Sequence, residues 1–237
     1  MNEEVLTAVL GSVIPSLVWL AFWLFEDRCE PEPKWRIVLT FLLGMAVVAL
    51  VLPIEDGIYA ALGYPNLTEV PLADMGTLLF VLWALTEELA KFGAAAIFGL
   101  MSRAYDEPLD ALIYMITAAL GFAAGENTLY LLGTHGGIAA SILEGDLRFA
   151  GATLLHTLAS GTIGLSLAFA FYLERRYRIL IAAAGVILAI ALHTLFNFFI
   201  LNVSAGQVLL VFVPLWLGIA LILLLTERIK TPERDYC

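Results

Sequence analysis

Charged residues are scarce in this sequence. Asp, Glu, Lys and Arg together make up 14% of the 237 residues, whereas roughly a quarter of an ordinary soluble domain is charged. Apolar residues make up 61%, and they fall in seven blocks of about twenty, the length at which a helix spans a bilayer. This composition excludes a soluble globular enzyme and predicts a polytopic membrane protein.

Basic residues and cysteines are also few. The sequence has 12 Lys and Arg residues and 22 Asp and Glu residues, so the formal net charge is −10. Nucleic acid is excluded as a partner, because its recognition needs a basic surface. The two cysteines, Cys29 and Cys237, fall in segments that we predict to be cytoplasmic. Because that compartment is reducing, we expect no structural disulfide.

The apolar blocks predict an all-α transmembrane helical bundle. They are continuously apolar rather than alternating, which excludes the strands of a membrane barrel. No internal repeat or appended soluble domain interrupts them, so residues 1–237 form one integral-membrane domain. The predicted spans are 5–25, 37–54, 75–100, 109–132, 149–173, 179–201 and 208–225.

The distribution of basic residues predicts the orientation. Ten of the twelve follow the first, third, fifth and seventh spans, and the positive-inside bias makes that side cytoplasmic. The N-terminus is then outside and the C-terminus inside, with 55–74 and 133–146 as external loops. The ten residues are Arg28, Lys34, Arg36, Arg103, Arg175, Arg176, Arg178, Arg228, Lys230 and Arg234.

Six ionisable side chains interrupt the apolar spans away from their ends. An ionised group at mid-bilayer costs on the order of 3 kcal/mol even on the lenient insertion scale, so such residues are typically functional and face the bundle interior. All six fall in the third to sixth spans. They are Glu87, Glu88, Lys91, Glu126, His156 and His193.

Depth and helical rotation predict that these six residues share one site. At ~1.5 Å per residue, the carboxylates and imidazoles lie roughly 9 to 18 Å below the external ends of their spans. Lys91 projects between Glu87 and Glu88, one turn away, and can pair with either. His193 and Asn197 are four residues apart and share a helix face.

Histidines and carboxylates around one point predict a divalent metal site. Zinc accepts both ligand types and is the favoured ion, with Glu126, His156 and His193 as our candidate ligands. A further Glu then activates water as general base. The same residues also permit a metal-free glutamic mechanism, in which His193 and Asn197 donate to the oxyanion. The compact H-E-x-x-H signature is absent, and both chemistries stay open.

Four motifs in register carry a family resemblance. Glu87 to Lys91 matches E-E-x-x-K, and Gly121 to Asn127 matches G-F-x-x-x-E-N. His156 to Gly161 matches H-x-x-x-x-G, and His193 to Asn197 matches H-x-x-x-N. In this order the motifs resemble the PrsW family of intramembrane proteases, distantly akin to the CAAX prenyl endopeptidases.

The resemblance implies a prokaryotic multi-pass protease of the cell membrane, with its active-site helices at roughly 75–201. Its substrate would be a single-span membrane protein, cut in or near its transmembrane segment, as in site-one cleavage of an anti-sigma factor. The site carried over is Glu87, Glu88, Glu126, His156 and His193, supported by Lys91 and Asn197.

Two further hypotheses concern transport and substrate docking. Intramembrane Glu, His and Lys also serve as proton relays, so a proton- or ion-coupled transporter is the alternative function. Transporters usually show repeats and broken helices, and this sequence has neither. For the protease, glycine-rich faces on the fourth and fifth spans, including Gly125, are a possible docking groove for the substrate helix.

Overall fold

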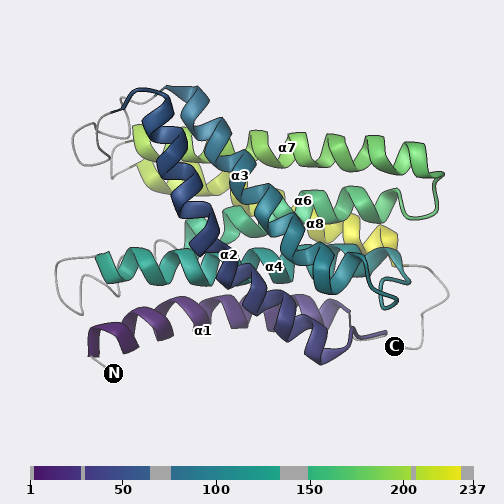
Figure 1. The fold of residues 1–237 in the computed structure, drawn as a ribbon. Coiled ribbons are helices and arrows are strands. Elements are labelled where there is room, and N and C mark those ends of the chain that lie inside the picture. The colour runs from purple at the N-terminus through teal and green to yellow at the C-terminus, as the bar shows by residue number, and fades with distance from the viewer. Residues whose placement is uncertain (1–2, 28–29, 65–75, 134–148, 204–206, 231–237) are drawn as a thin grey trace.

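The computed structural model describes residues 3–27, 30–64, 76–133, 149–203 and 207–230. Both cysteines lie outside these ranges. Within them the fold is entirely helical, which confirms the predicted all-α bundle (Figure 1). The long helices are α1 (Glu3–Glu26), α2 (Lys34–Ala61), α3 (Thr77–Ala95), α4 (Pro108–Gly133), α6 (Leu154–Phe169), α7 (Arg175–Asn202) and α8 (Val208–Ile229). Two π-helical turns, η2 (Ala96–Leu100) and η3 (Phe149–Thr153), continue α3 and precede α6.

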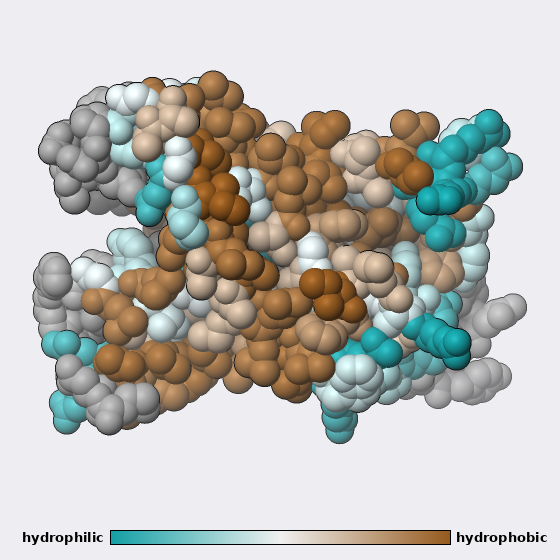
Figure 2. Space-filling model, viewed as in Figure 1, coloured by the Kyte–Doolittle hydropathy of each residue, from teal (hydrophilic) through white to brown (hydrophobic). Residues whose placement is uncertain are grey.

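The helices have the length and apolarity of membrane spans. Six of those described are long and apolar enough to cross a bilayer. Helix α3 has Glu87, Glu88 and Lys91 close together within its 19 residues, whereas each of the other six, with α6 counted from Gly151, contains an 18-residue apolar stretch with at most two charged residues. Figure 2 shows a largely hydrophobic face with hydrophilic residues gathered toward the ends of the bundle. The protein is therefore a multi-pass membrane protein.

Helix α2 is longer than the sequence predicted. Residues 55–61, which we expected in an external loop, continue the helix to Ala61. Tyr59 is buried beside Leu79 and Phe80 of α3, and this packing favours the added turns. The helix ends where Gly63 adopts φ +84 and its N–H donates to Ala60 O. A left-handed glycine here is a common helix stop, because it lacks the Cβ that disfavours this conformation.

Helix α4 forms the centre of the bundle and packs against α1, α2 and α6 (Figure 1). A Cβ added at Gly121 would lie 2.0 Å from Phe41 O, and one at Gly125 would lie 2.9 Å from Met45 O, both on α2. Backbone contact of this kind is the usual role of small residues in membrane helices. Helix α2 thus covers the glycine face that we considered for substrate docking, and that expectation is wrong for α4.

One end of the bundle, here called the basic end, is where α1, η2, α6 and α8 finish and α2, α4 and α7 begin. Its basic residues within the described ranges include Arg36, Arg103, Arg178 and Lys230. We predict this end to be cytoplasmic from its positive charge.

Candidate active site

Helix α3 brings three ionisable side chains to the bundle interior. Glu88 and Lys91 are fully buried, and Glu87 is 8% exposed. Lys91 Nζ donates a hydrogen bond to Glu88 Oε1 at 2.7 Å and lies 3.3 Å from Glu87 Oε2. One ammonium thus interacts with two adjacent carboxylates, as their three- and four-residue spacings on one helix predict.

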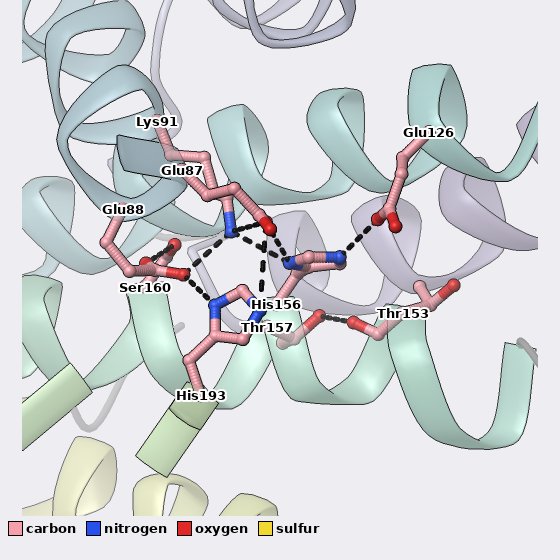
Figure 3. Close-up of polar contacts among 9 residues, drawn as sticks. All are labelled: Glu87, Glu88, Lys91, Glu126, Thr153, His156, Thr157, Ser160 and His193. Atoms are coloured by element: carbon pink, nitrogen blue, oxygen red, sulfur yellow. Dashed lines mark hydrogen bonds and ion pairs between the residues drawn. The ribbon is translucent and has the colours of Figure 1, made fainter. Parts of the chain in front are cut away.

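Partners from α6 and α7 complete the surroundings of Glu88 (Figure 3). Ser160 Oγ donates to Glu88 Oε2 at 2.7 Å, and His193 Nδ1 lies 2.9 Å from Glu88 Oε1. With Lys91, three side chains from three helices contact this carboxylate. A buried carboxylate is stable only with such partners, so Glu88 holds α3, α6 and α7 in register.

His156 on α6 lies between α3 and α4. Its Nδ1 is 2.8 Å from Lys91 Nζ, and its Nε2 is 2.7 Å from Glu126 Oε2. The Phe122 ring packs edge-on against the imidazole, with centroids 5.4 Å apart, and faces Lys91 Nζ at 4.5 Å. Helix α4 thereby contributes both a carboxylate and an aromatic wall to the site.

Glu87, His156 and His193 have ligand atoms within 4.8 Å of one another, as a metal ion requires. Glu87 Oε2 is 3.8 Å from His156 Nδ1 and 3.7 Å from His193 Nε2. This oxygen is buried and accepts no hydrogen bond from the described residues. The other nitrogen of each imidazole meets a carboxylate, Glu126 or Glu88, the usual support of a metal-bound histidine. The residues therefore fit a metal ion, although Lys91 must move away from His156 Nδ1 to admit it.

The comparison with protein families agrees with this geometry. Residues 32–221 match the family described as PrsW family intramembrane metalloprotease, and this range includes every residue of the cluster. The chain belongs to the PrsW family. It is therefore an intramembrane protease, as the four motifs predicted.

Curated relatives extend the match to most of the chain. The chain is 24% identical to Protease PrsW of Oceanobacillus iheyensis over 214 residues, 90% of this chain and 92% of that one. It is 33% identical to Protease PrsW of Geobacillus kaustophilus over 137 residues, 57% of each chain. The match to Protease PrsW of Bacillus subtilis, at 26% identity, covers 54% of this chain and 55% of that one. No solved structure matches the chain.

The PrsW-family site contains two residues that our predicted set omitted. Ser160 binds Glu88, and its position one turn after His156 was the available signal. Glu55, which we expected in a loop, lies in α2 with its carboxyl close enough to interact with that of Glu87, and its carbonyl accepts a hydrogen bond from Trp83 Nε1 at 3.2 Å. The signal in the sequence was Gly63, which is typical of a helix end and so indicates that the helix continues through residues 55–61.

Asn197 is the predicted residue that the cluster does not include. It lies one turn after His193 on α7 and is partly buried. In the described part of the chain, its side chain makes no hydrogen bond to any of the other six predicted residues. Its role as an oxyanion donor stays a prediction.

An apolar pocket lies between α6, α7 and α8, near the cluster. Its volume is about 410 Å³. Leu192 and Phe196 flank His193 in the sequence and contribute to its wall. Since the lining holds no acid, base or metal ligand, the pocket does not contain the chemistry. Its lining residues include Leu158, Leu192, Leu195, Phe196, Phe199 and Leu215.

Proposed function

We propose that this protein hydrolyses a peptide bond in or near the transmembrane segment of a single-span membrane protein, with a divalent metal, most suitably zinc, bound by Glu87, His156 and His193. The observation that carries the proposal is the pair of imidazoles. Each presents one nitrogen toward Glu87 Oε2, while a carboxylate holds its other nitrogen. Carboxylate oxygen and imidazole nitrogen are preferred zinc ligands.

This assignment replaces Glu126 with Glu87 in the ligand set predicted from sequence. Glu126 lies on the far side of the His156 ring, at Nε2, where it orients the imidazole. Bound in this way, zinc supplies Lewis acidity for the scissile carbonyl and for an attacking water. The protein contributes the geometry, the exclusion of lipid and the movement of protons.

Glu126 is our candidate for the general base. Its side chain is 34% exposed, compared with 11% for Glu87 and 0% for Glu88, so water reaches Glu126 most easily. Because the His156 ring separates Glu126 from Glu87 Oε2, a proton from the attacking water reaches this carboxylate through one intervening water and returns by the same path to the leaving amine. Glu88 and Lys91, which are fully buried, act as positioning residues for His193 and His156.

We further propose that the substrate class is an anti-sigma-factor-like protein, cut near the external end of its helix. The cluster lies in the outer half of the membrane if the positive-inside orientation holds. Peptide hydrolysis there requires local unwinding of the substrate helix, because an intact helix keeps its carbonyls hydrogen-bonded.

The test measures metal content and cleavage on the same purified samples. Single-span substrates are incubated with wild type, Glu87→Gln, Glu126→Gln, His156→Ala and His193→Ala. We expect all four variants to lose about 100-fold or more in cleavage rate. Only Glu126→Gln should retain close to wild-type metal content. Glu227→Gln, whose side chain is 64% exposed on α8, is the control and should match wild type.

Three results would contradict the proposal. Undiminished cleavage after exhaustive chelation supports the metal-free glutamic mechanism instead. Metal lost from Glu126→Gln but retained by Glu87→Gln restores the ligand set predicted from sequence. Coupled ion flux in liposomes, with no cleavage of any substrate, favours the transporter.

A further inference from the structure

A second group of buried carboxylates lies at the basic end of the bundle, outside the catalytic cluster. It consists of Asp27 after α1, Glu32 in the α1–α2 connection, and Glu107 and Asp110 where α4 begins. We call these four residues the acid cluster. Each is at most 7% exposed. Asp110 precedes Glu126 by 16 residues on α4, about 24 Å along the helix axis, so the catalytic mechanism leaves the acid cluster unused.

Local hydrogen bonds account for only part of this arrangement. Asp110 Oδ2 accepts the backbone N–H groups of Asp106 at 2.9 Å and Glu107 at 2.8 Å. This is one half of a capping box, and Pro108 occupies the first helical position, where proline is favoured. Tyr114 donates its hydroxyl hydrogen to Glu32 Oε2. These contacts explain why Asp110 and Glu32 are placed here.

The second oxygen of Asp110 is not explained by capping. Asp110 is 1% exposed, and its Oδ1 is buried without a hydrogen-bond partner among the described residues. The Glu32 carboxyl lies close enough to that of Asp110 for the two to share a hydrogen bond. A buried carboxylate oxygen facing other carboxylates is costly unless a cation or a proton lies between them.

The geometry of three of the side chains matches a cation site. Asp27, Glu107 and Asp110 each offer a carboxylate oxygen, and these three oxygens lie within 4.8 Å of one another. Hard cations such as Mg²⁺ and Ca²⁺ take oxygen ligands at about 2.0 to 2.6 Å, which allows such separations. Neither His nor Cys belongs to the group, so zinc and copper are disfavoured.

We propose that the acid cluster binds a hard divalent cation of the Mg²⁺ class, with Asp27, Glu107 and Asp110 as ligands. Glu32 lies at the edge of the site, held by Tyr114. The cation fastens the α1–α2 connection to the start of α4, the helix that carries Glu126. Its role is structural, and the proposal is independent of the protease assignment.

A shared proton is the competing occupant. Burial raises the pKa of the Glu32 carboxyl, and the charges of Asp106 and Glu107 act in the same direction, whereas hydrogen bonds with Tyr114 and Asp110 oppose them. A carboxyl with a raised pKa stabilises the folded protein below that pKa and loses this contribution as the pH rises through it. Acidification alone would then stabilise the fold, without any effect of Mg²⁺.

The test uses the full chain in detergent with the double substitution His156→Ala/His193→Ala, which removes the catalytic metal site. After chelation and dialysis, Mn²⁺ binding is followed by electron paramagnetic resonance, and the melting temperature is measured at pH 7.5 with Mg²⁺, Mn²⁺ or Ca²⁺. We expect one Mn²⁺ per chain, displaced by Mg²⁺, and a melting temperature raised by about 5 °C at saturation.

Variants of the ligands assign the site. Asp27→Asn/Glu107→Gln, made in the same background, should weaken Mn²⁺ binding by about tenfold or more. Asp110→Asn, which keeps a capping oxygen, provides an independent second variant. The control is Glu174→Gln/Glu227→Gln, which removes the same number of charges from side chains that are 71% and 64% exposed. The control should bind Mn²⁺ as its parent does.

Two outcomes overturn the proposal. One is the absence of bound Mn²⁺ in the double-histidine background, or Mn²⁺ binding that the ligand substitutions leave unchanged. The other is a melting temperature that rises on acidification but is indifferent to all three cations, which assigns a shared proton to the acid cluster.

Discussion

The two buried carboxylate clusters of this protein differ in how their charge is offset. In the catalytic cluster, Lys91 contacts Glu87 and Glu88, and the imidazoles of His193 and His156 contact Glu88 and Glu126. In the acid cluster, the backbone N–H groups of Asp106 and Glu107 donate hydrogen bonds to Asp110, and the Tyr114 hydroxyl donates one to Glu32. The catalytic cluster therefore contains a cation of the chain itself, Lys91, whereas our proposal assigns a cation from solution to the acid cluster.

The comparison separates the two chemistries that carboxylates support in a membrane protein. Nitrogen ligands beside Glu87 suit zinc, while an all-oxygen set suits Mg²⁺. The position in the bundle differs as well, because the acid cluster lies where helices begin and end and the catalytic cluster lies within spans. Removing a charge should therefore have opposite effects in the two places.

The largest expected effect is the loss of the cation in the catalytic cluster. Lys91→Met leaves Glu88 buried without its ammonium partner, and breaking a buried pair on one side costs about 3–5 kcal/mol. Unfolding in mixed micelles measures this change. Adding Glu88→Gln removes the uncompensated charge, so the double variant should recover a large part of the lost free energy of unfolding. Equal stability of the single and double variants would contradict the pairing.

The catalytic cluster was the more predictable of the two. Glu87, Lys91, His156 and His193 lie within otherwise apolar spans. Because a charge that faces lipid there is costly, the sequence predicts that these side chains gather in the interior of the bundle. The set of metal ligands was harder to predict, since Glu87 and Glu126 lie on opposite sides of the His156 ring. Which carboxylate faces which nitrogen depends on side-chain rotamers and helix rotation, and spacing alone does not determine these.

The acid cluster could not be recognised from sequence for a different reason. Charges such as Asp110 and Glu32 at the ends of spans are normally solvated, so their presence there is unremarkable. Their burial depends on packing between connections distant in sequence, such as the contact of Tyr114 with Glu32. Close approach of Gly99 to the Tyr114 ring, where a Cβ would lie 2.2 Å from Cγ, is another such long-range contact.

A smaller effect is expected when Glu88 loses a donor rather than its ion-pair partner. Ser160→Ala removes the hydroxyl that donates to Glu88 Oε2 at 2.7 Å, and a hydrogen bond to a charged group contributes about 1.5–3 kcal/mol. Thr157→Val on the same helix is the matched control, because its hydroxyl donates only to the neutral carbonyl of Thr153. The free energy of unfolding should fall more for Ser160→Ala, and Mg²⁺ should not change the difference. A larger loss of unfolding free energy in Thr157→Val than in Ser160→Ala would contradict the proposed role of Glu88 in holding the three helices together.

The smallest expected effect has the opposite sign and lies in the acid cluster. Glu107→Gln keeps the side-chain shape and the backbone N–H that Asp110 accepts, but it removes one charge that acts on Glu32. In chelated protein we expect the free energy of unfolding to rise by about 1 kcal/mol or less, because repulsion between carboxylates decreases. With saturating Mg²⁺ the order should reverse, since the wild type gains a ligand-bound cation that the variant holds weakly. A loss of stability in Glu107→Gln that is the same with and without Mg²⁺ would mean that the acid cluster, like the catalytic cluster, is already offset within the chain.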